Sequence, residues 1–173
     1  MQDVLFNEDQ IRDKIISLAT QIEGEYGNSE IIIIGVLVGS CIFTSDLIRA
    51  LWNLGMTNPM VDFIGISSYG ENRESSKTPR ITKDTDINIL GKDVLIIEDI
   101  AESGLSLRII SDSLKKRGAK SVKSVVLLDK PGKRVAEYVP DFIGFTVPDD
   151  VWIEGFGLDT AYKGRGNPRI VAR

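Results

Sequence analysis

The sequence has no histidine and only one cysteine, Cys41, among its 173 residues. Without histidine the chain cannot form a Ser-His or Cys-His catalytic pair, or the common zinc sites that contain histidine. A single cysteine also excludes a disulfide within the chain. If the protein binds a metal ion, we therefore expect a hard cation held by oxygen ligands.

Long hydrophobic runs and an excess of positive charge are missing as well. The longest apolar run, residues 31–38, is too short to span a bilayer, and the N-terminal stretch lacks the pattern of a signal peptide. The formal net charge of −4 does not favour nonspecific attraction to nucleic acid. We therefore expect a cytoplasmic protein that binds no membrane and no nucleic acid.

The chain has the length of one domain, and its apolar residues follow two alternating patterns. A helical pattern follows a capping-box signal at Asn7 and Gln10 and recurs twice, with apolar strand-like runs between the helices. Strands that alternate with helices favour a mostly parallel central sheet with helices on both faces. The sequence predicts an α/β fold with helical patterns at residues 11–22, 42–54 and 107–114, and strands at residues 30–38, 60–68, 94–97, 124–128, 138–147 and 151–156.

Two segments fit neither pattern. Residues 69–86 are mostly polar or charged, and residues 160–173 are basic and irregular. A connection as long as the first, inside a compact domain, is usually functional or disordered.

The stretch VLIIEDIAESGLS, residues 94–106, combines signals that favour a ligand site. An apolar strand runs into the adjacent acids Glu98 and Asp99, and a small-residue turn then opens a helix. In open α/β sheets ligands lie at the carboxyl ends of the strands, and a helix N-terminus there suits phosphate. The stretch therefore offers carboxylates for ribose hydroxyls, and backbone amides with Ser103 and Ser106 for a phosphate. Spacing alone leaves open that the two acids are merely solvated.

Five segments in order resemble the type I phosphoribosyltransferases, and among them the hypoxanthine-guanine phosphoribosyltransferases. They are VLVGS (36–40), VDFIGISSYG (61–70), VLIIEDIAESGLSL (94–107), LLDKPGKR (127–134) and VPDDVWIEGFGLD (147–159). The resemblance implies a magnesium-dependent enzyme of purine salvage. Such an enzyme exchanges a purine base for the pyrophosphate of 5-phosphoribosyl 1-diphosphate, giving a nucleoside monophosphate.

For the central stretch, the resemblance implies that Glu98 and Asp99 hold the ribose hydroxyls and that the following loop wraps the 5′-phosphate. Glu102 stands where the family usually has an aspartate, proposed as the acid/base that exchanges a proton with N7 of the purine. Its extra methylene changes where the carboxylate reaches. The phosphate loop consists of Ala101, Glu102, Ser103, Gly104, Leu105 and Ser106.

The resemblance also implies a purine site. Lys130 matches the lysine that donates to O6 and so selects 6-oxopurines over adenine. Trp152 stands where an aromatic ring stacks on the base, and Ile153 where the backbone meets the 2-position. The WIE triplet resembles xanthine-guanine enzymes too, so we expect hypoxanthine, guanine or xanthine as substrate.

The pyrophosphate and its metal ion are implied to meet three further parts of the chain. Asp159 matches an acid that approaches magnesium, usually through water, and Glu98 and Asp99 complete the expected metal-binding set. Arg165 matches an arginine that contacts pyrophosphate.

Val38 and Gly39 match a pyrophosphate-binding turn beside an unusual cis peptide, but Val38 departs from the family's lysine or arginine. The missing cation predicts weaker binding of the activated sugar unless Arg165, Arg169 or Arg73 compensates.

The resemblance finally implies an organisation of the single domain, residues 1–173. We expect a core at about 25–145, a small hood formed by the N-terminal segment and residues 146–173, and a mobile lid at about 68–86 that starts at Ser68 and Tyr69. We also expect a homodimer or homotetramer.

The sequence has two other interpretations, a regulator and a dinucleotide binder. A noncatalytic regulator that senses nucleotides or the activated sugar on the same fold fits the departures at Val38 and Glu102, but it would not need Lys130, Trp152 and Asp159. A Rossmann-type dinucleotide binder fails, because residues 101–106 lack the G-x-G-x-x-G glycines.

Overall fold

The computed structural model describes residues 3–27, 29–67 and 79–173. Ser68, Tyr69 and Arg73, and most of the expected lid, lie outside the described residues. No helix within the described ranges is long and apolar enough to cross a membrane.

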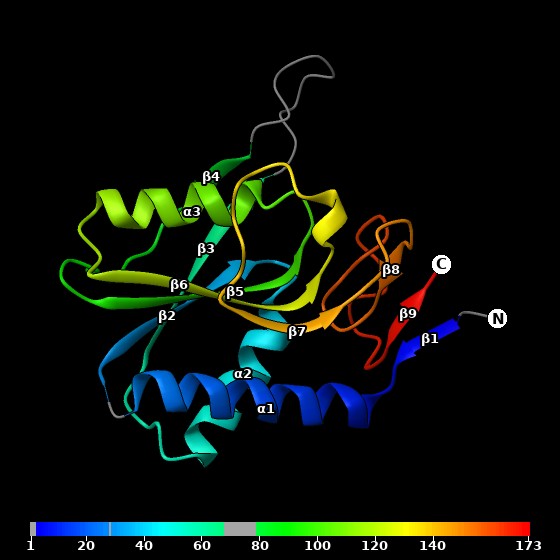
Figure 1. Ribbon diagram of the computed structural model, residues 1–173, viewed down its shortest axis with the longest axis horizontal. Helices are drawn as coiled ribbons and strands as arrows, with labels where there is room; N and C mark the ends of the chain where they lie inside the picture. Colours follow the sequence, from blue (N-terminus) through cyan, green and yellow to red (C-terminus); the bar gives the residue numbers. More distant parts are fainter. Residues whose placement is uncertain (1–2, 28, 68–78) are drawn as a thin grey trace.

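The chain is built on a six-stranded sheet with the order β4-β3-β2-β5-β6-β7 (Figure 1). Every neighbouring pair is parallel except β3 and β4, which are antiparallel. The α/β prediction is therefore confirmed. The strands are β2 (Ile31–Leu37), β3 (Met60–Ser67), β4 (Arg80–Lys83), β5 (Asp93–Ala101), β6 (Ser121–Asp129) and β7 (Phe142–Thr146).

Helices α1 (Glu8–Tyr26) and α2 (Cys41–Asn53) cover one face of this sheet, and α3 (Leu105–Lys116) covers the other (Figure 1). Strand β2 shows why its apolar run has no alternation. Ile31 and Ile33 pack into the core under α1 and α2, whereas Ile32 and Ile34 pack into the core under α3. Both faces of the strand are buried, as in other parallel sheets.

Helix α1 begins as the sequence predicts. Asn7 accepts a hydrogen bond from the Gln10 backbone N–H, and the Gln10 side chain accepts one from the Asn7 backbone, each at 2.9 Å. The helix ends at Gly27, whose positive φ of 53° is easily reached only by glycine.

A small antiparallel sheet at the chain ends lies beside the main one, with the order β1-β9-β8 (Figure 1). Its strands are β1 (Asp3–Phe6), β8 (Ile153–Glu154) and β9 (Ile170–Ala172), and a 3₁₀ turn, η1 (Pro131–Lys133), follows β6.

Several predictions about short segments were wrong. Residues 160–173 are not wholly irregular because they contain β9, and the patternless segment 69–86 contains β4. The strand predicted at 138–147 begins only at Phe142, and the one at 151–156 shrinks to Ile153–Glu154. Strands of two to four residues are too short to show a period, so their pairing depends on distant partners.

Candidate active site

Glu98 and Asp99 lie near the carboxyl end of β5, the edge where β2 and β6 also end. Glu98 is buried, and this burial, followed by the neighbouring charge of Asp99, raises the pKa of the Glu98 carboxyl well above its ordinary value. The guanidinium of Arg134 opposes the rise. Glu98 is therefore not the solvated strand-end acid that spacing alone left open.

Asp99 is partly buried, and burial is the main reason that its pKa rises to about 6. The hydrogen bond that its carboxylate accepts from the Ile100 N–H at 3.0 Å, and the charge of Arg165, both lower the pKa, while the charge of Asp159 raises it. The two adjacent carboxyls thus favour positively charged or hydrogen-bond-donating ligands.

A pocket of about 230 Å³ opens directly after the two acids. The turn that forms it relies on Gly104, which has a φ of 74° and directly precedes the first residue of α3. Ser103 Oγ accepts a hydrogen bond from the Leu105 N–H at 3.3 Å. Of the predicted ribose and phosphate residues, the pocket brings together Glu98, Asp99, Ala101, Glu102, Ser103, Gly104 and Ser106.

The segment after β6 holds this turn from behind. The Ser103 carbonyl accepts hydrogen bonds from the Val135 and Ala136 N–H groups, both at 2.9 Å. Arg134 donates to the Glu102 carbonyl at 2.9 Å and forms an ion pair with buried Asp129. Sequence reasoning missed the support given by Arg134 and Asp129, although both lie in the LLDKPGKR segment that it singled out for the lysine.

Lys130 is buried, with 4% of its surface exposed. Its ammonium donates hydrogen bonds to Glu102 Oε1 and to the Val151 carbonyl, each at 2.8 Å. A second pocket of about 200 Å³ lies here and shares Asp99, Ile100 and Glu102 with the first. Its lining is Asp99, Ile100, Glu102, Lys130, Trp152, Ile153, Leu158 and Asp159.

Trp152 lines this second pocket with more than half of its surface, 58%, exposed. Its indole N–H donates to Thr160 Oγ1 at 2.8 Å, which fixes the ring at the pocket wall. Ile153, the next residue, is buried. The tryptophan is therefore not a core residue, and an exposed ring on a pocket wall can stack on a flat ligand.

Asp159 and Arg165 form an ion pair with Oδ1 and Nη2 2.6 Å apart, and Arg165 also donates to the Gly157 carbonyl at 2.6 Å. Close backbone packing ties this turn to β5. A Cβ on Gly157 would lie 2.0 Å from the Gly39 carbonyl oxygen, and a Cβ on Gly39 would lie 1.9 Å from Asp99 Oδ2. Only glycines allow these three segments to approach so closely.

The family model for the phosphoribosyl transferase domain matches residues 1–161. A hypoxanthine-guanine phosphoribosyltransferase of Bacillus subtilis is 41% identical over 170 residues, which cover 98% of this chain and 92% of that protein. The chain belongs to the hypoxanthine-guanine phosphoribosyltransferase family. A relative of the same name from Aquifex aeolicus is 39% identical over 96% of this chain and 92% of its own length.

The fold of a hypoxanthine-guanine phosphoribosyltransferase from Bacillus anthracis, solved with a HEPES molecule in its active site, matches with a TM-score of 0.91. The two chains are 39% identical, and the match covers 100% of this chain and 99% of the other. The resemblance stated from the sequence motifs is thereby confirmed.

The non-proline cis peptide implied by the family resemblance is present between Leu37 and Val38. The Val38 side chain is 60% exposed beside Gly39. Gly39, the next residue, lies against the Asp99 carboxylate, so a lysine or arginine at position 38 would add a cation at the same edge of the sheet as Asp99.

Among the described residues, no cluster of three or more Asp, Glu, His or Cys side chains could hold a metal ion. Glu98 and Asp99 line one pocket, and Asp159 lines the adjoining one together with Asp99. A divalent cation at this family's site would therefore take most of its ligands from substrate and water, as magnesium often does.

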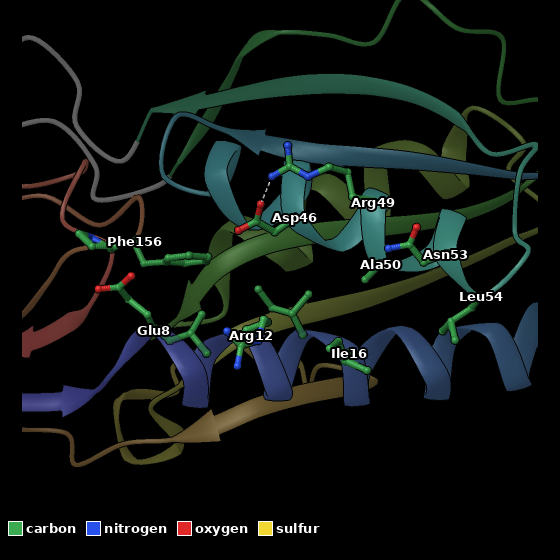
Figure 2. A pocket seen from close by; sticks show the side chains of 12 residues that line it. Glu8, Arg12, Ile16, Asp46, Arg49, Ala50, Asn53, Leu54 and Phe156 are labelled. Atoms are coloured by element: carbon green, nitrogen blue, oxygen red, sulfur yellow. Dashed lines mark hydrogen bonds and ion pairs between the residues drawn. The ribbon is translucent and has the colours of Figure 1, made fainter.

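A larger pocket, about 590 Å³, lies between α1 and α2 (Figure 2). Ile11, Ile15, Ile16 and Leu54 contribute apolar walls, and the charged side chains sit at the rim. Glu98, Asp99, Glu102, Lys130, Trp152 and Asp159 line the two smaller pockets, where a buried carboxyl and a buried ammonium converge, so those pockets form the candidate active site. The predicted pyrophosphate residues Val38, Gly39 and Arg165, and Leu105 of the phosphate loop, line neither pocket.

Proposed function

We propose that the chain transfers the 5-phosphoribosyl group from 5-phosphoribosyl 1-diphosphate to a 6-oxopurine in purine salvage. The observation that carries the proposal is the pair of adjoining pockets that share Asp99, Ile100 and Glu102. One contains a helix N-terminus and carboxylates, and the other a buried ammonium and an exposed indole. This order fits phosphate, ribose and base along one nucleotide.

The phosphate and ribose are held by complementary groups. The N-terminal N–H groups of α3, together with the hydroxyls of Ser103 and Ser106, suit the 5′-phosphate. Glu98 and Asp99 accept hydrogen bonds from the 2′ and 3′ hydroxyls. Their negative charge also stabilises the oxocarbenium character that develops at C1′.

In the reaction the bond between C1′ and the pyrophosphate oxygen breaks, and its electron pair leaves with pyrophosphate. N9 of the base supplies the pair for the new bond to C1′, and Glu102 takes the proton that the purine loses at N7. Glu102 Oε1 accepts from Lys130 in the structure, so we expect Glu102 to turn from the lysine toward N7 when a base binds.

Lys130 then donates to O6 of the purine. Adenine carries an amino group there, which would face a buried donor and leave both groups without an acceptor. Trp152 stacks on the base, and the backbone at Ile153 meets its 2-position. We extend the proposal to xanthine because of the WIE triplet at residues 152–154.

Magnesium fits the site because the site offers carboxylate oxygens, which are hard donors. The pKa values of Glu98 and Asp99 are raised, and a bound cation would stabilise the ionised form of both carboxyls. Asp99, Glu98 and Asp159 form no three-carboxylate cluster, so each would meet the ion singly or through water, and pyrophosphate oxygens and water would supply most of its ligands. Arg165, Val38 and Gly39 would form the rest of the pyrophosphate subsite. When bound, the ion neutralises the charge of the leaving group.

We extend the proposal to a cytoplasmic location and to a homodimer or homotetramer. We also propose that the domain is divided into a core, a hood and a lid. Asp99 in the expected core lies against Gly39, and Gly39 lies against Gly157 in the expected hood. This close packing supports a single domain in which core and hood form one unit.

The test is an assay of the purified protein with 5-phosphoribosyl 1-diphosphate, magnesium and each of hypoxanthine, guanine, xanthine and adenine. We expect monophosphates from hypoxanthine and guanine, and none from adenine. A Glu98→Gln/Asp99→Asn double variant serves as the negative control.

The Glu102–Lys130 pair is also the one observation that favours a regulator, because it engages the proposed acid/base carboxylate with the proposed base-selecting lysine. Nucleotide binding without turnover of any 6-oxopurine would establish the regulator and reject the transferase.

A further inference from the structure

Glu154 is a buried carboxylate that the proposed reaction does not use. It lies in β8, and 4% of its surface is exposed. The same segment carries Trp152 and Ile153, which wall the purine pocket. Burying a carboxylate is unfavourable by several kcal/mol unless it is paired, so its presence in a strand next to a ligand pocket calls for a partner.

Arg173, the residue directly after β9, supplies that partner. Its Nη2 donates to Glu154 Oε1 at 3.1 Å, and its Nε lies 3.1 Å from Oε2 as an ion pair. The Arg173 backbone N–H donates to the Trp152 carbonyl at 2.9 Å. One residue therefore holds both the backbone of the stacking tryptophan and the carboxylate two positions further along the strand.

The Glu154 side chain also touches the turn that carries Asp159 and Arg165. Gly164 in this turn has a φ of 89°, and a Cβ there would lie 2.3 Å from Glu154 Cδ and 2.4 Å from Oε1. The Gly164 carbonyl accepts from the Asn167 N–H at 3.0 Å, and the Asn167 carbonyl accepts from the Phe156 N–H at 2.7 Å. These bonds tie the C-terminal side of the turn to Phe156, two residues after β8.

We propose that Glu154 is a positioning residue that fixes the purine wall, Trp152 and Ile153, relative to the pyrophosphate turn, Asp159 to Arg165. What these two surfaces bind rests on the proposed function. The carboxylate sits between them and touches both the Arg173 clamp and Gly164. Moving it therefore shifts both surfaces together.

Stability alone does not explain the pair. Replacing a buried ion pair by apolar residues of similar volume is often neutral or stabilising, and Ile153, Ile170 and Val171 beside it are already apolar and buried. A charged pair fixes one arrangement of partners, whereas apolar side chains tolerate several. The ion pair between Glu154 and Arg173 therefore contributes a fixed arrangement of the two segments rather than stability.

The first variant is Glu154→Gln, which keeps the shape and removes the charge. Hydrogen exchange measured by mass spectrometry is expected to become faster in residues 151–154 and in residues 157–165, and to stay unchanged in α3 and β5. Kinetics should show KM for the purine and KM for the activated sugar rising together, each by about tenfold, as small misplacements can produce.

The second variant combines Glu154→Val with Arg173→Leu. We expect its melting temperature to equal or exceed that of the wild type, while both KM values stay raised. Glu30→Gln is the matched control, since Glu30 pairs with Lys92 in an exposed ion pair at the opposite end of the sheet.

Three results would overturn the inference: faster exchange confined to residues 151–154, faster exchange throughout the chain, or normal KM values in the double variant. The exchange measurement needs no turnover. If the wild-type protein failed to turn over any purine, the proposed function would fall, while exchange would still decide whether Glu154 couples the two segments.

Discussion

Asp99→Asn is expected to stabilise the ligand-free fold at neutral pH. The same substitution removes a carboxylate that we propose binds the ribose hydroxyls. Burial raises the pKa of the Asp99 carboxyl to about 6, against an ordinary value of 3.8. The folded chain therefore binds a proton more tightly than the unfolded chain, and ionisation destabilises the fold. Asparagine has a similar shape and never carries that charge.

The size of the effect follows from the pKa difference. Since one pKa unit corresponds to about 1.4 kcal/mol, ionised Asp99 destabilises the fold by up to about 3 kcal/mol. For a chain of this size, that corresponds to a gain of about 6–12 °C in melting temperature for the asparagine variant. The free energy of unfolding of the wild type should fall by this amount between about pH 4 and pH 6, and should stay constant above pH 6.

Thermal melts of both proteins in EDTA at pH 4, 5, 6, 7 and 8 test the reasoning. The two melting temperatures should coincide at pH 4 and separate above pH 6. Asp112→Asn is the control, because Asp112 forms an exposed ion pair with Arg108 and should change stability by less than about 0.5 kcal/mol. Equal melting temperatures at pH 8, or an equal gain at every pH, would show that burial does not destabilise the Asp99 carboxylate.

The other predictions concern the two pockets and one strand end. Val38→Lys is expected to tighten the binding of 5-phosphoribosyl 1-diphosphate, because it adds a cation at the rim; unchanged or weaker affinity by calorimetry would contradict this. Lys130→Met should lower kcat/KM for hypoxanthine and guanine by at least about 10²-fold in steady-state assays, since methionine has a similar length and no N–H to donate to O6; a decrease below threefold would count against the role of Lys130. Asp93→Asn should lower the free energy of unfolding at pH 7 by about 0.5–1 kcal/mol. Hydrogen bonds from Lys120, then from Ser121, lower the pKa of Asp93, so its contribution is present above its unfolded pKa and is lost as the pH falls through the folded value. Urea unfolding at pH 7 and pH 2.5 measures this, and an equal difference at both pH values would contradict it.

The long elements could be predicted because their signals are local. The Asn7–Gln10 capping box lies within four residues, and the apolar run of β2 reflects burial on both faces of one strand. The acids after β5 and the glycine before α3 are equally local, so the ribose and phosphate half of the site was visible in one stretch. Such features depend on neighbours in the sequence.

The rest depends on partners far apart in the sequence. Strand β9 pairs with β1 across more than 160 residues, and three apolar residues in a basic segment give no sign of that. Arg134 supports the phosphate turn only because β5 and β6 are neighbours in the sheet. The sequence motifs predict separate roles for Lys130 and Glu102. Their direct hydrogen bond is visible only in the folded structure, because it joins residues 28 positions apart.

That contact gives the extra methylene of Glu102 a physical consequence. A buried ammonium needs acceptors, and without a purine Lys130 finds them in Glu102 Oε1 and the Val151 carbonyl. About half of the Glu102 side chain is exposed, so the carboxylate can turn to solvent when a base arrives, whereas the backbone carbonyl keeps the lysine in place. Breaking a charge-assisted hydrogen bond costs about 1.5–3 kcal/mol. In the proposed reaction the new bond from Lys130 to O6 offsets this cost for a 6-oxopurine but not for adenine, so we expect the Glu102–Lys130 pair to sharpen base selection.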